Sequence, residues 1–316
     1  MNEFELIRQY FQRPARNALL GVGDDAALLL PTPGKALAVS SDMLVCDRHF
    51  FADTDPYWLG HKALAVNLSD MAAMGARPRW FLLSLALPAV DKNWLKRFSD
   101  GLFSLADAHD VSLVGGDTTR GPLNLSLQIM GEVAPEQALR RDQAVPGDDI
   151  WISGQVGEAA LALRYLQQQV TLPAEHIESA LLRLQAPQPR VSLGLALTQY
   201  SRCAIDISDG LVADLGHICA ASACAAEIQL TALTRSALMH SIGRDLATQL
   251  MLAGGDDYEL CFTAAPAHAD AIIQLSQQLG LALTRIGRIV PGSGVRVLQA
   301  DGQPLPQVFK GFDHFG

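Results

Sequence analysis

Three observations predict a two-domain α/β protein. The 316 residues are 49% hydrophobic and only 18% charged, which supplies enough apolar side chains for two cores. Segments with strand and helix patterns alternate along both halves of the chain. Short motifs that carry aspartate, most of them with glycine or serine, recur in both halves. They lie at residues 23–25, 40–42, 69–70, 115–120, 206–210 and 254–257. The pattern favours two α/β domains that face one another across a cleft.

The first predicted elements are a helix and two strands. Apolar residues between Phe4 and Phe11 have helical spacing, and a Gly/Asp turn then leads into an apolar strand within residues 21–30. Residues 36–45 form the next strand, which Ser40-Ser41-Asp42 interrupts. Three oxygen-bearing side chains in a buried-looking strand are costly unless they bind something, although a hairpin edge is an alternative explanation.

A long helix follows the second of these strands. Asp55 is typical of an N-cap, Pro56 of the first helical position, and Gly75 of a helix end. Asn67 and Asp70 are three residues apart and therefore share one face of a nearly apolar helix. This placement favours a functional polar pair over a solvated stripe.

The remaining elements of the first half end in the richest motif of the chain. A strand at 81–87 and a helix at 94–106 precede the strand 111–114. The stretch 113–121 is then expected to form a strand tip, followed by a returning strand at 123–130. Its glycines would let N–H groups approach an anion, while an aspartate ligates a hard cation and an arginine binds phosphate. An ordinary strand-to-loop turn is the alternative.

The second half is expected to begin after a polar, proline-bearing linker at 135–147, so the domains span 1–134 and 148–316. Its predicted elements are a strand at 149–153, helices near 158–168 and 235–251, a strand at 204–207 whose tip 208–210 caps the helix 211–221, a strand through Phe262, and a final helix and two strands.

Composition excludes several classes of protein. The formal charge of −9, without a run of basic residues, disfavours a nucleic-acid partner. Five cysteines without a Cys-x-x-Cys pair indicate neither a disulfide framework nor a zinc site. The acidic N-terminus is unlike a signal peptide, and the longest apolar run, 80–90, is too short to span a bilayer. We therefore expect a soluble cytoplasmic protein.

The clustered aspartates indicate magnesium-assisted phosphoryl transfer. The sequence lacks a Walker A loop, a dinucleotide fingerprint, a nucleophile elbow and a zinc helix. Carboxylates and hydroxyls are the ligands that Mg²⁺ prefers, and several such ions could neutralise phosphates on an acidic protein. Glycoside hydrolysis is a competing use of paired carboxylates, but only 6% of the residues are aromatic.

Six motifs, in order over nearly the whole chain, resemble the thiamine-monophosphate kinase family. They are Gly21–Ala27, Val39–Val45 with His49-Phe50, Lys62–Gly75, Gly115–Arg120, Ile205–Leu211 and Gly254–Leu260. This resemblance implies a two-domain fold like that of aminoimidazole ribonucleotide synthetase, with N-terminal domains that pair in a homodimer. It also implies transfer of a phosphoryl group from ATP to thiamine phosphate, giving thiamine diphosphate directly, without a phosphoenzyme.

The resemblance also implies residue roles. Metal ligation is expected from Asp25, Ser40, Ser41, Asp42, Asp70, Asp117, Asp206 and Asp209, with Asp42, Asp117 and Asp206 also catalytic. ATP contacts are expected from Gly116, Asp117, Arg141 and Ser208, and contacts to thiamine phosphate from His49, Asp256 and Phe312. The family usually has Glu where Asp256 stands, and often Tyr or Trp where Phe312 stands.

Two alternatives stay open at this stage. A non-catalytic nucleotide-sensing module would share the fold, but loss of a metal-ligating position would favour it and all of those positions are filled here. An ATP-dependent synthetase acting on another small phosphate ester would share both the fold and the metal ligands. Turnover of thiamine phosphate, an aminoimidazole precursor and thiamine distinguishes these alternatives.

Overall fold

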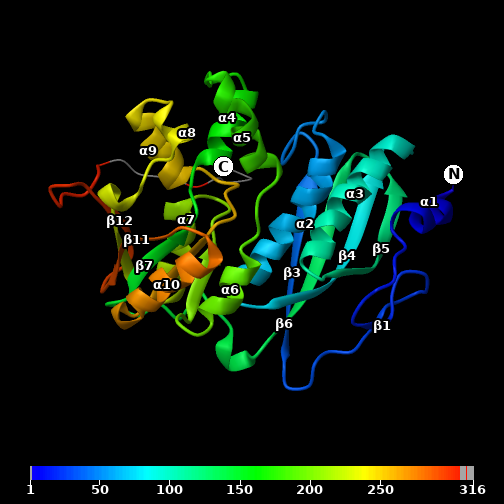
Figure 1. Ribbon diagram of the computed structural model, residues 1–316, viewed down its shortest axis with the longest axis horizontal. Coiled ribbons are helices and arrows are strands. Elements are labelled where there is room, and N and C mark those ends of the chain that lie inside the picture. The colour runs from blue at the N-terminus through cyan, green and yellow to red at the C-terminus, as the bar shows by residue number, and fades with distance from the viewer. Residues whose placement is uncertain (1, 307–310, 312–316) are drawn as a thin grey trace. The chain divides into compact units, whose positions relative to one another are not determined.

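The structure, a computed structural model, describes residues 2–306 and Gly311. The chain divides into two compact units, each with its own sheet and helices (Figure 1). The first unit contains Met1–Met71 and Ala76–Glu136, and the second contains Ala72–Gly75 and Gln137–Gly316. Mixed sheets and helices in both units confirm the predicted fold class.

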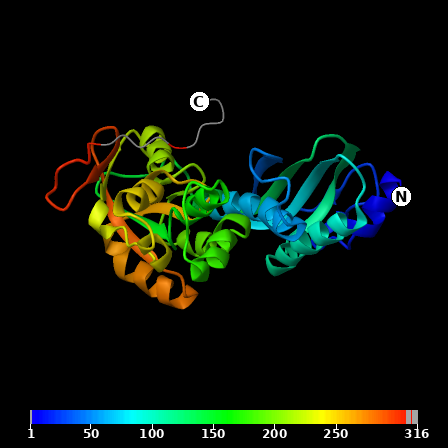
Figure 2. The same cartoon turned by 90° about the horizontal axis from the view of Figure 1, so that it is seen from above.

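The first unit is built on a four-stranded sheet in the order β3-β6-β4-β5. Strands β4 and β5 are parallel, and the other neighbours are antiparallel. Figure 2 shows α2 and α3 on the same side of this sheet. In chain order the elements are α1 (Glu3–Tyr10), β1 (Ala18–Leu20), β2 (Leu28–Leu29), β3 (Ala36–Val45), α2 (Pro56–Ala73), β4 (Arg77–Leu87), α3 (Lys92–Ala108), β5 (Ser112–Arg120), β6 (Asn124–Val133) and the 3-10 helix η1 (Pro135–Gln137).

Local sequence determines both ends of α2, as predicted. The Asp55 carboxylate accepts a hydrogen bond from the N–H of Tyr57 at 2.9 Å. This bond satisfies one of the helix's unpaired N-terminal donors. Gly75 adopts a positive φ of 64° just beyond the helix, a conformation that glycine reaches without steric cost.

The strand β3 presents different residues to the two faces of the sheet. Ala38 and Leu44 are buried, and Ser40 and Asp42 lie between them on the same face because side chains alternate along a strand. On the opposite face, four apolar side chains of β3 are between 36% and 56% exposed. They are Leu37, Val39, Met43 and Val45. Strand β3 pairs with β6 and lies at the edge of the sheet, as the hairpin-edge alternative allowed.

The expected strand tip at 113–121 is wrong. Strand β5 continues through this motif to Arg120 and pairs with β4 along its length, with a register shift after Leu113. A Cβ atom at Gly116 would lie 1.8 Å from the carbonyl oxygen of Leu83. Gly116 therefore permits close approach of two strands. The sequence suggested that this glycine serves anion binding, and the structure gives it a packing role.

The second unit has a six-stranded sheet in the order β12-β9-β11-β7-β10-β8, in which only the pair β12 and β9 is parallel among the described residues. In chain order the elements are β7 (Asp149–Ser153), α4 (Glu158–Leu166), α5 (Ala174–Gln185), α6 (Val191–Leu197), β8 (Cys203–Asp206), α7 (Leu211–Ala221), β9 (Ala225–Gln229), η2 (Leu230–Ala232), α8 (Ala237–His240), α9 (Arg244–Ala253), β10 (Leu260–Ala264), η3 (Pro266–His268), α10 (Ala269–Leu279), β11 (Leu283–Val290) and β12 (Gly294–Leu298).

Both faces of the central strand β7 are buried. Ile150 and Ile152 join one apolar cluster with residues of α4, α7 and α9. Trp151 points to the other face and stacks on Phe262, with ring centroids 6.4 Å apart. Burial on two faces explains why β7 is apolar throughout its middle rather than alternating.

Sequence patterns missed some helices of the second unit. No helix was expected over residues 169–202, which contain α5 and α6, and only Ala180 and Leu184 of α5 are buried. The single helix expected at 235–251 is two, α8 and α9, separated at Ser241–Gly243. Of the expected linker, residues from Gln137 onward group with the second unit.

Candidate active site

Two carboxylates and a hydroxyl come together where α2 covers β3. The Ser40 hydroxyl donates a hydrogen bond to the Asp70 carboxylate, with 2.5 Å between the oxygens. Asp42 is two residues further along β3 and therefore faces the same helix. The structure thus brings together three of the predicted metal ligands from separate elements.

The electrostatics of this group suit a bound cation. Burial, followed by the negative charge of Asp70, raises the pKa of Asp42 from 3.8 to about 7. Two nearby carboxylates repel one another, and a divalent ion with oxygen ligands would relieve that repulsion. Among the described residues, no three His, Cys, Asp or Glu side chains form a group that could hold a metal. The group described here fits Mg²⁺ with two carboxylates and one hydroxyl, an ion that commonly keeps several water ligands.

Four other predicted site residues line a hollow of about 980 Å³ in the first unit. They are Asp25, Ser41, Gly116 and Asp117. Ser41 belongs to the face of β3 opposite to Ser40 and Asp42, because neighbouring side chains alternate. The first-half ligands are therefore divided into two groups, and sequence spacing alone did not reveal that division.

In the second unit, the motif 206–210 forms the end of β8 and the start of α7. Asp206 is buried, while Ser208 and Asp209 are half-buried. The tip 208–210 was expected to cap α7, and the N-cap is its last residue, Gly210, although no side chain makes a capping hydrogen bond. The N–H groups of Ser208, Asp209 and Gly210 instead donate to one carboxylate oxygen of Asp214 at 3.1, 3.0 and 3.1 Å.

Asp214 is a residue that the sequence interpretation missed. Its side chain is buried, and burial raises its pKa to about 6 even though the backbone donors act in the opposite direction. The available signal was an acidic residue four positions after Gly210, in the first turn of an otherwise apolar helix.

The loop 254–259 pairs with the end of β8. The N–H of Asp256 donates to the carbonyl of Ser208, and the N–H of Tyr258 donates to that of Ile207, both at 2.8 Å. The Tyr258 hydroxyl also donates to the Asp256 carboxylate at 3.1 Å. These bonds place Asp256, the predicted acceptor contact, beside the predicted ATP contact Ser208.

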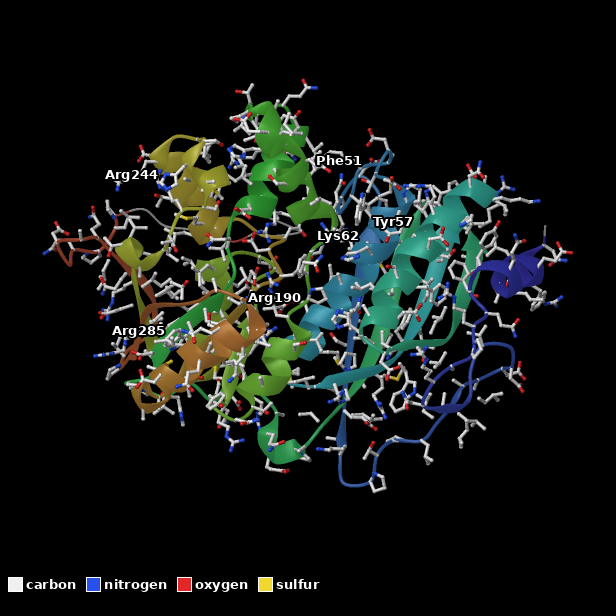
Figure 3. The ribbon with its side chains drawn as sticks, viewed as in Figure 1. Phe51, Tyr57, Lys62, Arg190, Arg244 and Arg285 are labelled. Atoms are coloured by element: carbon white, nitrogen blue, oxygen red, sulfur yellow. The ribbon has the colours of Figure 1, made fainter. Side chains whose placement is uncertain are left out.

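The other acids of this loop anchor it to the unit's interior. Asp257 accepts hydrogen bonds from the N–H groups of Gly157 at 2.6 Å and Ala159 at 3.4 Å, and burial raises its pKa well above the usual value. Glu259 forms a buried ion pair with Arg190, the residue before α6 (Figure 3), and accepts a bond from the Ser153 hydroxyl at 2.5 Å. Three acids close in sequence therefore have different environments.

The remaining predicted contacts are spread over the chain. The Nδ1 atom of His49 accepts from the N–H of Val45 at 3.0 Å. Arg141 has an exposed side chain, and its carbonyl accepts from the Ser222 hydroxyl at 2.8 Å. Phe312 lies outside the described residues.

Known proteins resemble the whole of this chain. Residues 23–133 match the N-terminal domain of AIR synthase related protein, and residues 145–299 match the C-terminal domain of that family. The thiamine-monophosphate kinase of Salmonella typhimurium is 44% identical over 318 residues, which cover 99% of this chain and 98% of the relative. The chain belongs to the thiamine-monophosphate kinase family.

Solved structures of thiamine-monophosphate kinases share the fold as well. The enzyme from Stenotrophomonas maltophilia K279a is 50% identical, with a TM-score of 0.87 and 96% of each chain covered. A structure described as AaThiL complexed with AMPPCP and TMP is 28% identical, with a TM-score of 0.78, covering 99% of this chain and 96% of its own. Within the described part of this family member, no helix is long and apolar enough to cross a membrane.

Proposed function

We propose that this protein transfers the terminal phosphoryl group of ATP to thiamine phosphate and releases ADP and thiamine diphosphate. The observation that carries the proposal is identity of 44% over almost the full length with a thiamine-monophosphate kinase. A more distant relative of the same fold is described as a complex with AMPPCP and TMP. The clustered aspartates of this chain could hold the Mg²⁺ that such a transfer uses.

Each unit carries side chains that we propose as metal ligands. Asp25, Ser40, Ser41, Asp42, Asp70, Asp117, Asp206 and Asp209 are the proposed ligands of several Mg²⁺ ions. Bound Mg²⁺ would neutralise charge on the phosphate oxygens. The approach of Asp42 to Asp70 supports this assignment, because it places negative charges together where a cation would stabilise them.

The other proposed roles concern the two substrates. Gly116, Asp117, Arg141 and Ser208 contact ATP, whereas His49, Asp256 and Phe312 contact thiamine phosphate. Asp42, Asp117 and Asp206 hold the reacting groups for direct in-line transfer, without a phosphoenzyme. The contact between the Asp256 loop and Ser208 supports neighbouring sites for acceptor and donor.

A homodimer in the cytoplasm completes the proposal. The exposed apolar side chains of β3 are suited to burial against a second copy of the chain. They are Leu37, Val39, Met43 and Val45. We expect Val39→Lys with Met43→Glu to convert the protein to a monomer in sedimentation analysis, whereas a parent chain that is already monomeric would contradict this part.

A comparison of acceptors tests the proposed activity. The purified protein is supplied with ATP, Mg²⁺ and either thiamine phosphate, thiamine or an aminoimidazole precursor, and products are separated by chromatography. We expect ADP and thiamine diphosphate in equal amounts from thiamine phosphate alone. Turnover of the aminoimidazole precursor instead would assign the chain to another activity of the same fold.

A further inference from the structure

The loop that leads into α7 is held by an acid of that helix. Three consecutive N–H groups, those of Ser208, Asp209 and Gly210, lie 3.0 to 3.1 Å from the same Oδ2 atom of Asp214. Asp214 is 3% exposed, so these bonds lie away from solvent. One oxygen atom therefore determines the direction of three adjacent peptide groups.

Consecutive N–H groups at the start of a helix ordinarily form a binding place for a phosphate or another anion. In this loop, the carboxylate of Asp214 already occupies that position. Position 210, which closes the loop, requires glycine, because its φ is 123° and an added Cβ would lie 2.9 Å from the backbone of Ala253. The loop thus differs from a phosphate-binding loop in what its amides bind.

The same loop carries oxygen atoms assigned above to metal and nucleotide. Asp206 precedes it, and the side chains of Ser208 and Asp209 are half-exposed. We propose that Asp214 is a positioning residue: by binding the three amides, it fixes the loop so that Asp206 and Asp209 present oxygen atoms to a divalent cation and Ser208 faces the nucleotide. The inference rests on the proposed function, since it requires a metal site at this loop.

The geometry makes a specific prediction about the chemistry at position 214. All three amides bind one oxygen, so the single side-chain oxygen of asparagine can replace it without the negative charge. Alanine provides no acceptor. If Asp214 acts by holding amides, Asp214→Asn should therefore keep the loop in place and preserve metal binding, whereas Asp214→Ala should lose both. If Asp214 acts through its charge, both substitutions should weaken metal binding.

The experiment measures metal affinity and amide protection separately from turnover. Binding of Mg²⁺ to the full chain, with a non-hydrolysable ATP analogue present, is followed by calorimetry, and hydrogen exchange is measured at residues 208–210. We expect Asp214→Ala to weaken Mg²⁺ binding about tenfold or more and to accelerate exchange at these amides similarly. Asp214→Asn should stay within about threefold of the parent chain in both measurements.

A matched control is Asp270→Ala, which removes an exposed acid from the first turn of α10 and should change neither quantity. If Asp214→Ala does not fold, Asp214→Ser replaces it, because a serine hydroxyl is too short to reach three amides.

The outcomes are distinguishable. Wild-type Mg²⁺ affinity in the alanine or serine variant overturns the inference, as does equal weakening in Asp214→Asn while its amides stay protected. A parent chain that binds no Mg²⁺ would overturn the proposed metal site, and this inference with it.

Discussion

The carboxylates of this protein fall into two kinds of environment. Asp42 lies near another acid, and its pKa is raised to about 7 by burial and by the charge of Asp70. Glu259 is also buried, but it pairs with the guanidinium of Arg190 and with a hydroxyl. Each arrangement is held by the fold, and the second neutralises the carboxylate with a cationic side chain of the protein itself.

The two environments correspond to two roles: acids that bind ligands, and acids that stabilise the fold. A buried acid paired with arginine contributes to folding only as a pair, because loss of one partner leaves an uncompensated charge. Acids placed together cost stability in the free protein and repay that cost when a cation binds. Substitutions of the two kinds should therefore have opposite effects on stability and on activity.

The largest effect should follow removal of one charge from the carboxylate pair. We expect Asp42→Asn to reduce kcat about 10³-fold, because the lost carboxylate stabilises charge in the transition state through the metal. Thermal unfolding of the free protein should not become easier, since repulsion from Asp70 is relieved. Asp117→Asn should reduce kcat similarly. Unfolding of these variants at lower temperature would show instead that the residues are structural.

Removing Arg190 from its ion pair with Glu259 should reduce stability, in contrast to Asp42→Asn. Arg190→Met is expected to lower the free energy of unfolding by about 3 to 5 kcal/mol, measured by denaturant titration. Lys96→Met is the control, because its pair with Asp100 is exposed and such pairs contribute about 0 to 1 kcal/mol. Adding Glu259→Gln to Arg190→Met should restore part of the loss, and failure to do so would argue against charge as the cause.

The raised pKa of Asp42 should be visible in the pH dependence of stability. Its pKa in the folded protein lies above the usual 3.8, so its contribution to stability is complete below about pH 4 and is lost as pH rises toward 7. Asp214 and Asp257 act in the same direction, so the difference between the parent chain and Asp42→Asn isolates this group. The variant should lose less stability between pH 4 and 8, and identical profiles would contradict the assignment.

Added Mg²⁺ should change both the pH dependence of stability and the rate of phosphoryl transfer. We expect it to stabilise the parent chain more at pH 8 than at pH 5, because protons compete with the metal for Asp42. Activity should rise with free Mg²⁺ beyond the amount complexed with ATP. Saturation at one metal ion per ATP in initial-rate measurements would exclude several protein-bound ions.

The smallest effects should appear at the acceptor contacts. Asp256→Asn is expected to raise KM for thiamine phosphate about fivefold, with less change for ATP, because an attraction to the cationic thiazolium is lost. Phe312→Ala should act similarly through lost stacking. Initial rates with each substrate varied in turn measure both constants, and equal changes for the two substrates would remove these residues from the acceptor site.

Sequence patterns predicted the elements whose signals are local. Asp55, Pro56 and Gly75 correctly delimit α2, and the serine and aspartate in β3 correctly indicated an unusual polar group. Asp214 could not be assigned, because its role depends on three amides that become adjacent only when the loop folds. Likewise, Gly116 resembles an anion-binding glycine in sequence, and only the proximity of β4 shows its packing role.

The difference between acids near Asp257 is also a property of the folded chain. Asp256, Asp257 and Glu259 are close in sequence, yet one contacts a tyrosine hydroxyl, one binds backbone amides and one pairs with Arg190, 69 residues away in the chain. No local pattern predicts which long-range partner each carboxylate acquires.

The carboxyl titration of Asp42 shows whether this group and Asp70 are held together for a cation. Carbon NMR of the labelled protein, assigned with Asp42→Asn, follows this group from pH 4 to 9 with and without Mg²⁺ and an ATP analogue. We predict a pKa near 7 in the free protein and a fall of about 2 units or more when Mg²⁺ and the analogue are bound. An ordinary pKa that does not respond to the metal would contradict the claim that Asp42 and Asp70 are held together for a cation.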